Sequence, residues 1–166
     1  MVALAVEPSG ISSAPRCQYQ AQDSQQTLSD GLAEYYGRNR GRVAPPDSLS
    51  PESAALFRSH DMCHVIFGLD TTLSDEAMAD TRTLLSCDVG WRRYAKYMTS
   101  DPEAKAIFKQ VGYVTVIWGT IRTLPRMARA VWEAWKMPKR WPWDPPETYQ
   151  SRSLGDLRRE FGIRVI

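Results

Sequence analysis

The chain has 166 residues, of which 43% are hydrophobic and 24% are charged. This composition is typical of a soluble globular protein and unlike that of a disordered or membrane-embedded chain. The formal net charge of +2 is too small to indicate a nucleic-acid-binding protein. The three cysteines show no CxxC spacing, so they predict neither a disulfide framework nor a zinc ribbon and favour a reducing compartment.

A chain of this length is expected to form a single domain. Residues 1–26 are rich in Ser, Gln, Ala and Pro and lack periodicity, so we expect a flexible or loosely docked N-terminal tail followed by one helical domain over residues 27–166. The first residues lack the features of a secretory signal, and no segment reaches the roughly 18 apolar residues needed to cross a bilayer. We therefore expect a cytoplasmic protein.

The first helices are marked by their end signals. A short helix is predicted over residues 29–36 and a longer one over residues 51–67. Ser50 can cap the longer helix, Pro51 suits its first position, and Gly68 can close it in a left-handed conformation.

A second long helix should follow after a short turn. It is predicted to begin near Asp75, capped by Thr72 or Ser74, and to run to about residue 98 with a break at residues 88–90. Together, the two long helices predict a helical hairpin.

Another helix is expected to begin at Pro102, and residues 102–137 contain the most amphipathic segment of the chain. Its predicted apolar stripe comprises Ile117, Ile121, Leu124, Ala128, Val131, Trp132 and Trp135. Pro125 should kink this helix. A last short helix is predicted over residues 154–161, closed by Gly162. The expected fold is therefore an all-α, single-domain helical bundle with a metal-binding helical hairpin and one long kinked amphipathic helix.

The only two histidines, His60 and His64, are four residues apart on the first predicted long helix. This spacing places both imidazoles on one helix face, where they can reach one metal ion. Asp61 can join from the rim or orient a ligand, and Glu76, at the start of the next helix, can fold back towards the histidines. The alternative is that the histidines are solvated and that the acids are helix-end charges.

Two nearby residues have plainer interpretations. Cys63 can be a soft metal ligand, but a small core residue is the preferred interpretation. Gly68 is interpreted as a helix terminator and not as part of a phosphate-binding loop, because the sequence contains no phosphate-loop motif.

The pattern HDxxH, eleven residues and then Glu, which begins at His60 and ends at Glu76, resembles the signature of the coenzyme Q biosynthesis protein four family. The segments GLAEYYGRN and PPDSLSPESAALFRSHD before the motif, and SLGDLRREFGI near the C-terminus, also resemble this family. The resemblance covers roughly residues 28–165.

The resemblance implies an all-helical protein of ubiquinone biosynthesis that binds one divalent metal ion. Zinc is favoured, with iron, cobalt and manganese as alternatives. The implied ligands, which are also the implied catalytic residues, are His60, Asp61, His64 and Glu76. The family also implies a peripheral location on the inner face of the membrane, or on the matrix side in a mitochondrion.

The implied activity is an oxidative decarboxylation that replaces the ring carboxyl group of a polyprenylated hydroxybenzoate by a hydroxyl group. The alternative is a non-catalytic scaffold or prenyl-lipid carrier. Expected partners are the polyprenylated aromatic precursor, the other ubiquinone biosynthesis enzymes and the membrane surface; nucleic acid is not expected, and a homodimer is an open alternative to a monomer. A metal-dependent phosphohydrolase is a weaker rival, because it needs further His and Asp ligands.

The sequence departs from the family pattern at Asp75, where relatives often have a small residue such as glycine. An extra carboxylate there can change the metal preference or only cap the helix. Lipid or membrane contact is expected from Ile117, Ile121, Leu124, Trp132, Trp135, Trp141 and Trp143, because mixed aromatic and basic residues are typical of a membrane interface. The alternative is that the apolar stripe packs on the hairpin while the arginines are solvated.

Overall fold

The computed structural model describes residues 15–41, 43, 50–100 and 113–166. The predicted helix start at Pro102 and most of the predicted tail lie outside these residues. The helices are η1 (Gln18–Gln20), α1 (Leu28–Arg38), α2 (Pro51–Phe67), α3 (Leu73–Ser86), α4 (Trp91–Ser100), α6 (Tyr113–Lys136), η3 (Glu147–Tyr149) and α7 (Leu154–Phe161). The described part contains isolated β-bridges but no strand, which confirms the all-α, single-domain prediction.

The predicted helix ends are confirmed at the hairpin. The Ser50 side chain accepts a hydrogen bond from Ser53 N, and Gly68 closes α2 with φ 71°. The Thr72 side chain caps α3 by accepting from Asp75 N. These are contacts within one turn, so the local sequence is sufficient to specify them.

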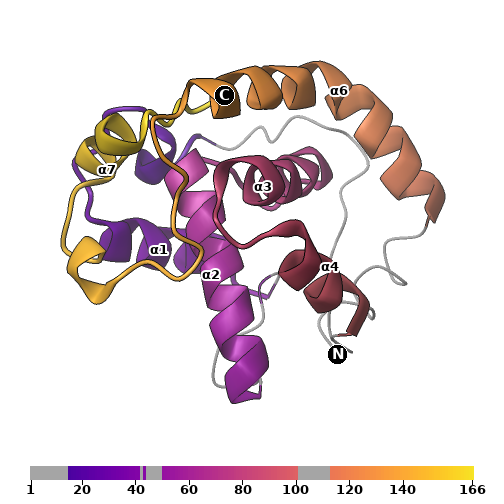
Figure 1. The fold of residues 1–166 in the computed structure, drawn as a ribbon. Coiled ribbons are helices and arrows are strands. Elements are labelled where there is room, and N and C mark those ends of the chain that lie inside the picture. Colours follow the sequence, from indigo (N-terminus) through magenta and orange to yellow (C-terminus); the bar gives the residue numbers. More distant parts are fainter. Residues whose placement is uncertain (1–14, 42, 44–49, 101–112) are drawn as a thin grey trace.

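The elements form layers around the hairpin (Figure 1). α2 packs against α1 on one side and α3 on the other, and α6 crosses over α3. α7 lies beside α1 at the far end of the molecule. The hairpin is therefore covered on both sides, which buries the last turns of α2.

Residues 17–26 of the predicted tail are docked onto the domain. Tyr19 is fully buried, and its hydroxyl donates to the Leu69 carbonyl oxygen at 3.0 Å. A single buried aromatic in a polar, aperiodic stretch gives no periodic signal, so composition alone could not reveal this docking.

Arg158 of α7 connects this N-terminal segment to α2. Its guanidinium is fully buried and donates to carbonyl oxygens on both sides. The acceptors are Tyr19 O (2.6 Å), Ala21 O, Gln22 O (3.5 Å), Val65 O (2.8 Å) and Ile66 O (2.8 Å). Burial lowers the pKa of Arg158 to about 10, so the side chain remains a cation at neutral pH. It hydrogen-bonds two carbonyls at the end of the helix that carries both histidines, of which Val65 O also accepts from Gly68 N.

The prediction that Trp141 and Trp143 lie at a membrane interface is wrong for this conformation, because both indoles are buried in the core. The backbone of Trp141 pairs with the α3–α4 junction, through Trp141 N to Ser86 O (2.8 Å) and Asp88 N to Trp141 O (3.0 Å). This pairing folds the segment after α6 back over the bundle, where the Trp141 ring meets Phe161 at a centroid distance of 5.1 Å.

The apolar stripe of α6 faces outward. Leu124, Trp132 and Trp135 are 52%, 57% and 77% exposed, and the helix instead packs through the buried Thr123 and Ala130. The interpretation in which the stripe packs on the hairpin is therefore wrong for these three residues. The side chains of Ile117 and Ile121 lie outside the described part. In addition, the membrane-span criteria of length and hydropathy are met by none of the described helices.

Candidate metal centre

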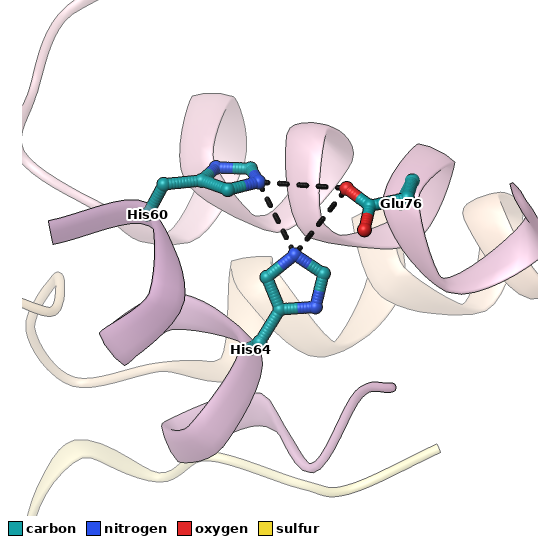
Figure 2. Close-up of side chains that lie close together, drawn as sticks. All are labelled: His60, His64 and Glu76. Atoms are coloured by element: carbon teal, nitrogen blue, oxygen red, sulfur yellow. Dashed lines mark hydrogen bonds and ion pairs between the residues drawn. The ribbon is translucent and has the colours of Figure 1, made fainter. Parts of the chain in front are cut away.

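His60 and His64 of α2 and Glu76 of α3 point towards one another (Figure 2). The two Nε2 atoms are 3.1 Å apart, and Glu76 Oε2 lies 3.6 Å from His60 Nε2 and 3.4 Å from His64 Nε2. One ligand atom from each residue falls within 4.8 Å of the others. These three residues could therefore hold one metal ion.

His64 is oriented by its surroundings. Its Nδ1 lies 3.0 Å from the carbonyl oxygen of Asp70, so Nδ1 carries the proton and donates, while the lone pair of Nε2 faces the cluster. The Tyr35 ring stacks on the imidazole at a centroid distance of 5.4 Å. The turn between α2 and α3 thus selects the tautomer that a metal ligand needs.

Asp75 does not belong to this cluster. Its carboxylate accepts from Arg126 of α6 at 2.8 Å and from the backbone N–H of Asp70 at 3.2 Å. Asp75 therefore ties the start of α3 to α6 and to the turn. Asp75 is engaged by these partners and adds no ligand to the cluster.

Asp61 is also outside the three-residue group. It is buried, and its Oδ2 accepts from the Tyr36 hydroxyl at 3.0 Å. Burial raises the pKa of Asp61, although both histidines and the Tyr36 hydrogen bond act against that rise. The structure therefore brings together three of the four predicted ligands and places Asp61 where its charge favours protonated histidines.

Asp80 is a residue of this site that the sequence reasoning missed. It lies one helical turn after Glu76 on α3, accepts a hydrogen bond from the Tyr94 hydroxyl, and raises the pKa of His60 through its charge. The i,i+4 spacing from Glu76 was the signal that could have found it. Cys63, in contrast, is a buried core residue whose Sγ lies 3.6 Å from that of Cys87.

The charges of the cluster are strongly coupled. Burial lowers the pKa of His60, but the hydrogen bond and charge of Glu76 outweigh this effect and raise it to about 9. Burial and Glu76 oppose each other in the same way at His64, with a net rise in its pKa. Burial raises the pKa of Glu76, but the histidines hold it below its usual range. Without a metal, the cluster keeps a proton that an incoming cation must displace.

Metal binding is therefore expected to strengthen with pH. Because His60 must lose its proton, the apparent affinity should rise about tenfold per pH unit up to a pKa of about 9. The folding stability of the metal-free chain should change with pH in the opposite direction. The pKa of His60 is about 9 in the folded chain, against an ordinary value of 6.5. Protonation of His60 therefore stabilises the fold fully below about pH 6.5, and this stabilisation is lost as the pH rises through 9.

The measurement is the Tm of metal-loaded and chelator-treated protein between pH 6 and 9. The gap between the two should widen with pH. A gap that stays constant with pH would contradict the assignment of this proton to His60. The same holds if the Tm of metal-free His60→Gln depends on pH as strongly as that of the metal-free parent.

Comparison of the chain with protein-family models, with curated proteins and with solved structures finds no match. The family resemblance consequently depends on the motif and its flanking segments.

Proposed function

We propose that this chain is a metal-dependent enzyme of ubiquinone biosynthesis that removes the ring carboxyl group of a polyprenylated hydroxybenzoate by oxidative decarboxylation. The observation that carries the proposal is the convergence of His60, His64 and Glu76 on one point. These are three of the four residues of the motif that the chain shares with the coenzyme Q biosynthesis protein four family.

The donor set fits a divalent metal. Zinc binds imidazole nitrogen at about 2.0–2.1 Å, so two ligand atoms of a tetrahedral site are about 3.3 Å apart. The three separations here are 3.1, 3.4 and 3.6 Å. Two imidazoles and one carboxylate are also the ligands of non-haem iron sites. We favour zinc, with iron, cobalt and manganese as alternatives.

The buried Nδ1 of His60 supports this fit. It has no hydrogen-bond partner among the described residues, so no contact there fixes which ring nitrogen carries the proton. An ion held at Nε2 would place that proton on Nδ1.

The residues of the site would have different roles in metal binding and substrate approach. His60 and His64 hold the metal from the buried side, with side chains 13% and 0% exposed, whereas the Glu76 side chain is 39% exposed. The substrate would therefore approach past Glu76. A bound divalent metal supplies a Lewis acid for the ring carboxylate or phenol oxygen. Asp61 and Asp80 add negative charge that favours a cation in the site.

The peripheral membrane location is part of the proposal. The outward stripe of Leu124, Trp132 and Trp135 offers apolar contact to a lipid surface. Exposed basic residues lie on the same helix and just after it, including Arg129, Lys136, Lys139 and Arg140. Such a surface would let the enzyme reach a substrate whose tail stays in the bilayer, near the other enzymes of the pathway.

The test is turnover by the purified, metal-loaded chain. A polyprenylated para-hydroxybenzoate labelled at its carboxyl carbon is supplied with dioxygen. The ring-to-carboxyl bond breaks and a ring C–O bond forms. With dioxygen as the oxidant, the balanced products are the quinone, carbon dioxide and water. Labelled carbon dioxide is the readout. We expect Glu76→Gln to lower its release at least about a hundredfold, as expected for a lost electrostatic contact at the reacting centre.

A metal-loaded, folded chain that releases no label would instead favour the non-catalytic scaffold or prenyl-lipid carrier. In that case, vesicle binding through the α6 stripe should persist while turnover is absent.

A further inference from the structure

A basic pocket whose lining includes none of the metal ligands lies at the end of α6. It has a volume of about 460 Å³ and is lined by Arg129, Glu133, Lys136, Gly162 and Arg164. The lining brings the second half of α6 together with the residues that follow α7, close to the C-terminus (Figure 1). The volume falls within the range of about 300–1,000 Å³ usual for small-molecule sites.

A buried guanidinium adjoins this pocket. Arg82 of α3 is 1% exposed, and its Nη2 donates to the carbonyl oxygen of the lining residue Arg164 at 3.0 Å. Its Nη1 is buried without a hydrogen-bond partner in the part of the chain that the structure describes. The charges of Glu133 and Arg129 act on it from the pocket lining.

The contacts of Arg82 are its hydrogen bond to Arg164 and the ring of Phe67, whose centroid lies 5.3 Å from the guanidinium carbon. Buried cations are normally paired, because an unpaired buried charge costs several kcal/mol. Arg82 has no ion pair in the described residues, and Glu133 makes its ion pair with Lys136 at 3.7 Å. The charge of Arg82 therefore adds to the excess positive charge around the pocket, which favours a bound anion.

We propose that this pocket binds a phosphate group. Three cations and one carboxylate line it, an excess of two positive charges that matches the charge of about −1.5 to −2 on a phosphate monoester at neutral pH. The arginines can grip two phosphate oxygens each. The site is independent of the metal centre, with which it shares no residue, whereas Arg129 and Lys136 also belong to the basic surface of the proposed membrane contact.

The phosphate group can belong to a soluble ester or to a lipid headgroup. Lys136 links the pocket to the exposed stripe of α6, because its Nζ lies 4.7 Å from the centroid of the Trp132 ring. A lipid headgroup held in the pocket would place the apolar stripe at the lipid surface. The shared chemistry is the phosphate, and the two sources are distinguished below.

The primary test is isothermal titration calorimetry of the purified chain with inorganic phosphate and with pyrophosphate at low ionic strength. Arg129→Gln and Arg164→Gln, which alter exposed side chains, should each weaken binding about tenfold. Glu133→Gln should tighten it several-fold, because the only carboxylate of the lining is removed.

Two control variants test whether phosphate binding is specific to this pocket. Arg92→Gln removes an exposed arginine of α4 that does not line the pocket, and it should leave binding unchanged. Glu76→Gln should also leave it unchanged, which separates this pocket from phosphate bound to the metal. No measurable binding of either probe, or an Arg92→Gln loss as large as that of Arg164→Gln, would overturn the proposal.

Vesicle flotation then distinguishes the sources. If the protein binds phosphatidylcholine vesicles only when they contain phosphatidic acid, and Arg164→Gln and pyrophosphate both release it, the pocket holds a lipid headgroup. If Arg164→Gln weakens pyrophosphate binding but leaves flotation unchanged, the pocket holds a soluble phosphate ester. Both results support the pocket as a phosphate site.

Discussion

Replacing His64 by Ala is expected to abolish stoichiometric metal binding. The parent chain should carry about one divalent ion, since three ligand atoms from α2 and α3 lie within 4.8 Å of one another. His64 is the ligand whose tautomer is fixed by Asp70. Its loss should cost more than the roughly 10–100-fold in affinity that follows removal of a ligand's hydrogen-bond partner. Elemental analysis of the purified proteins measures this.

Because His64 is fully buried, its removal can also disturb packing. Glu76→Gln is therefore the second variant, since the half-exposed Glu76 can be replaced by a side chain of equal size. It should also lose the metal while circular dichroism shows the parent's helix content. Asp75→Asn is the matched control. It alters the neighbouring carboxylate, which pairs with Arg126, and should keep its metal. Equal metal content in all these proteins would sink the assignment.

Replacing Arg158 by Met is expected to lower the free energy of unfolding by about 3–5 kcal/mol, the usual cost of breaking a buried charged network. The change removes every hydrogen bond from Arg158 to the carbonyls of residues 19–22 and of the α2 C-terminus. Ala21 O and Val65 O keep a backbone donor, from Ser24 N and Gly68 N. The carbonyls of Tyr19, Gln22 and Ile66 lose the donor that Arg158 supplied, so the cost exceeds that of the packing alone. Urea denaturation measures the change.

Arg159 provides the control for this prediction, because it is the next residue in the chain and has the same side chain. Its side chain is 61% exposed and pairs only with Asp156 among the described residues, so Arg159→Met should change the free energy of unfolding by about 0.5 kcal/mol or less. Arg158→Lys should recover only part of the loss, because one ammonium cannot reach acceptors on two segments. Similar midpoints for Arg158→Met and Arg159→Met would contradict the role given to Arg158.

The α2–α3 hairpin was predictable from the sequence because its signals are local. The serine cap, the first-position proline and the left-handed Gly68 each act within one helical turn. The histidine pair was predictable for the same reason, since a spacing of four residues on a helix fixes a shared face. Glu76 joined the prediction because a short turn must bring the start of α3 near the end of α2.

The position of Asp61 outside the metal cluster could not be predicted from local spacing. Helical spacing leaves it at the rim of the histidine face, and its actual partner is Tyr36, on a different helix. Asp75 is a similar case, because its pairing with Arg126 depends on how α6 crosses α3. Where two acids compete for a metal or a cation, the choice depends on contacts between elements that are distant in the sequence.

The sequence by itself determined the all-α class, the helix ends of the hairpin and the shared face of His60 and His64, because each depends on contacts within a few residues. Tertiary structure alone decided the docking of residues 17–26, the burial of Trp141 and Trp143 and the outward direction of the α6 stripe. Periodicity shows that one face of a helix is apolar, but it does not show what lies against that face. For α6, the packing of Thr123 and Ala130 on α3 leaves the tryptophans outside, and this choice is made by the neighbouring helix.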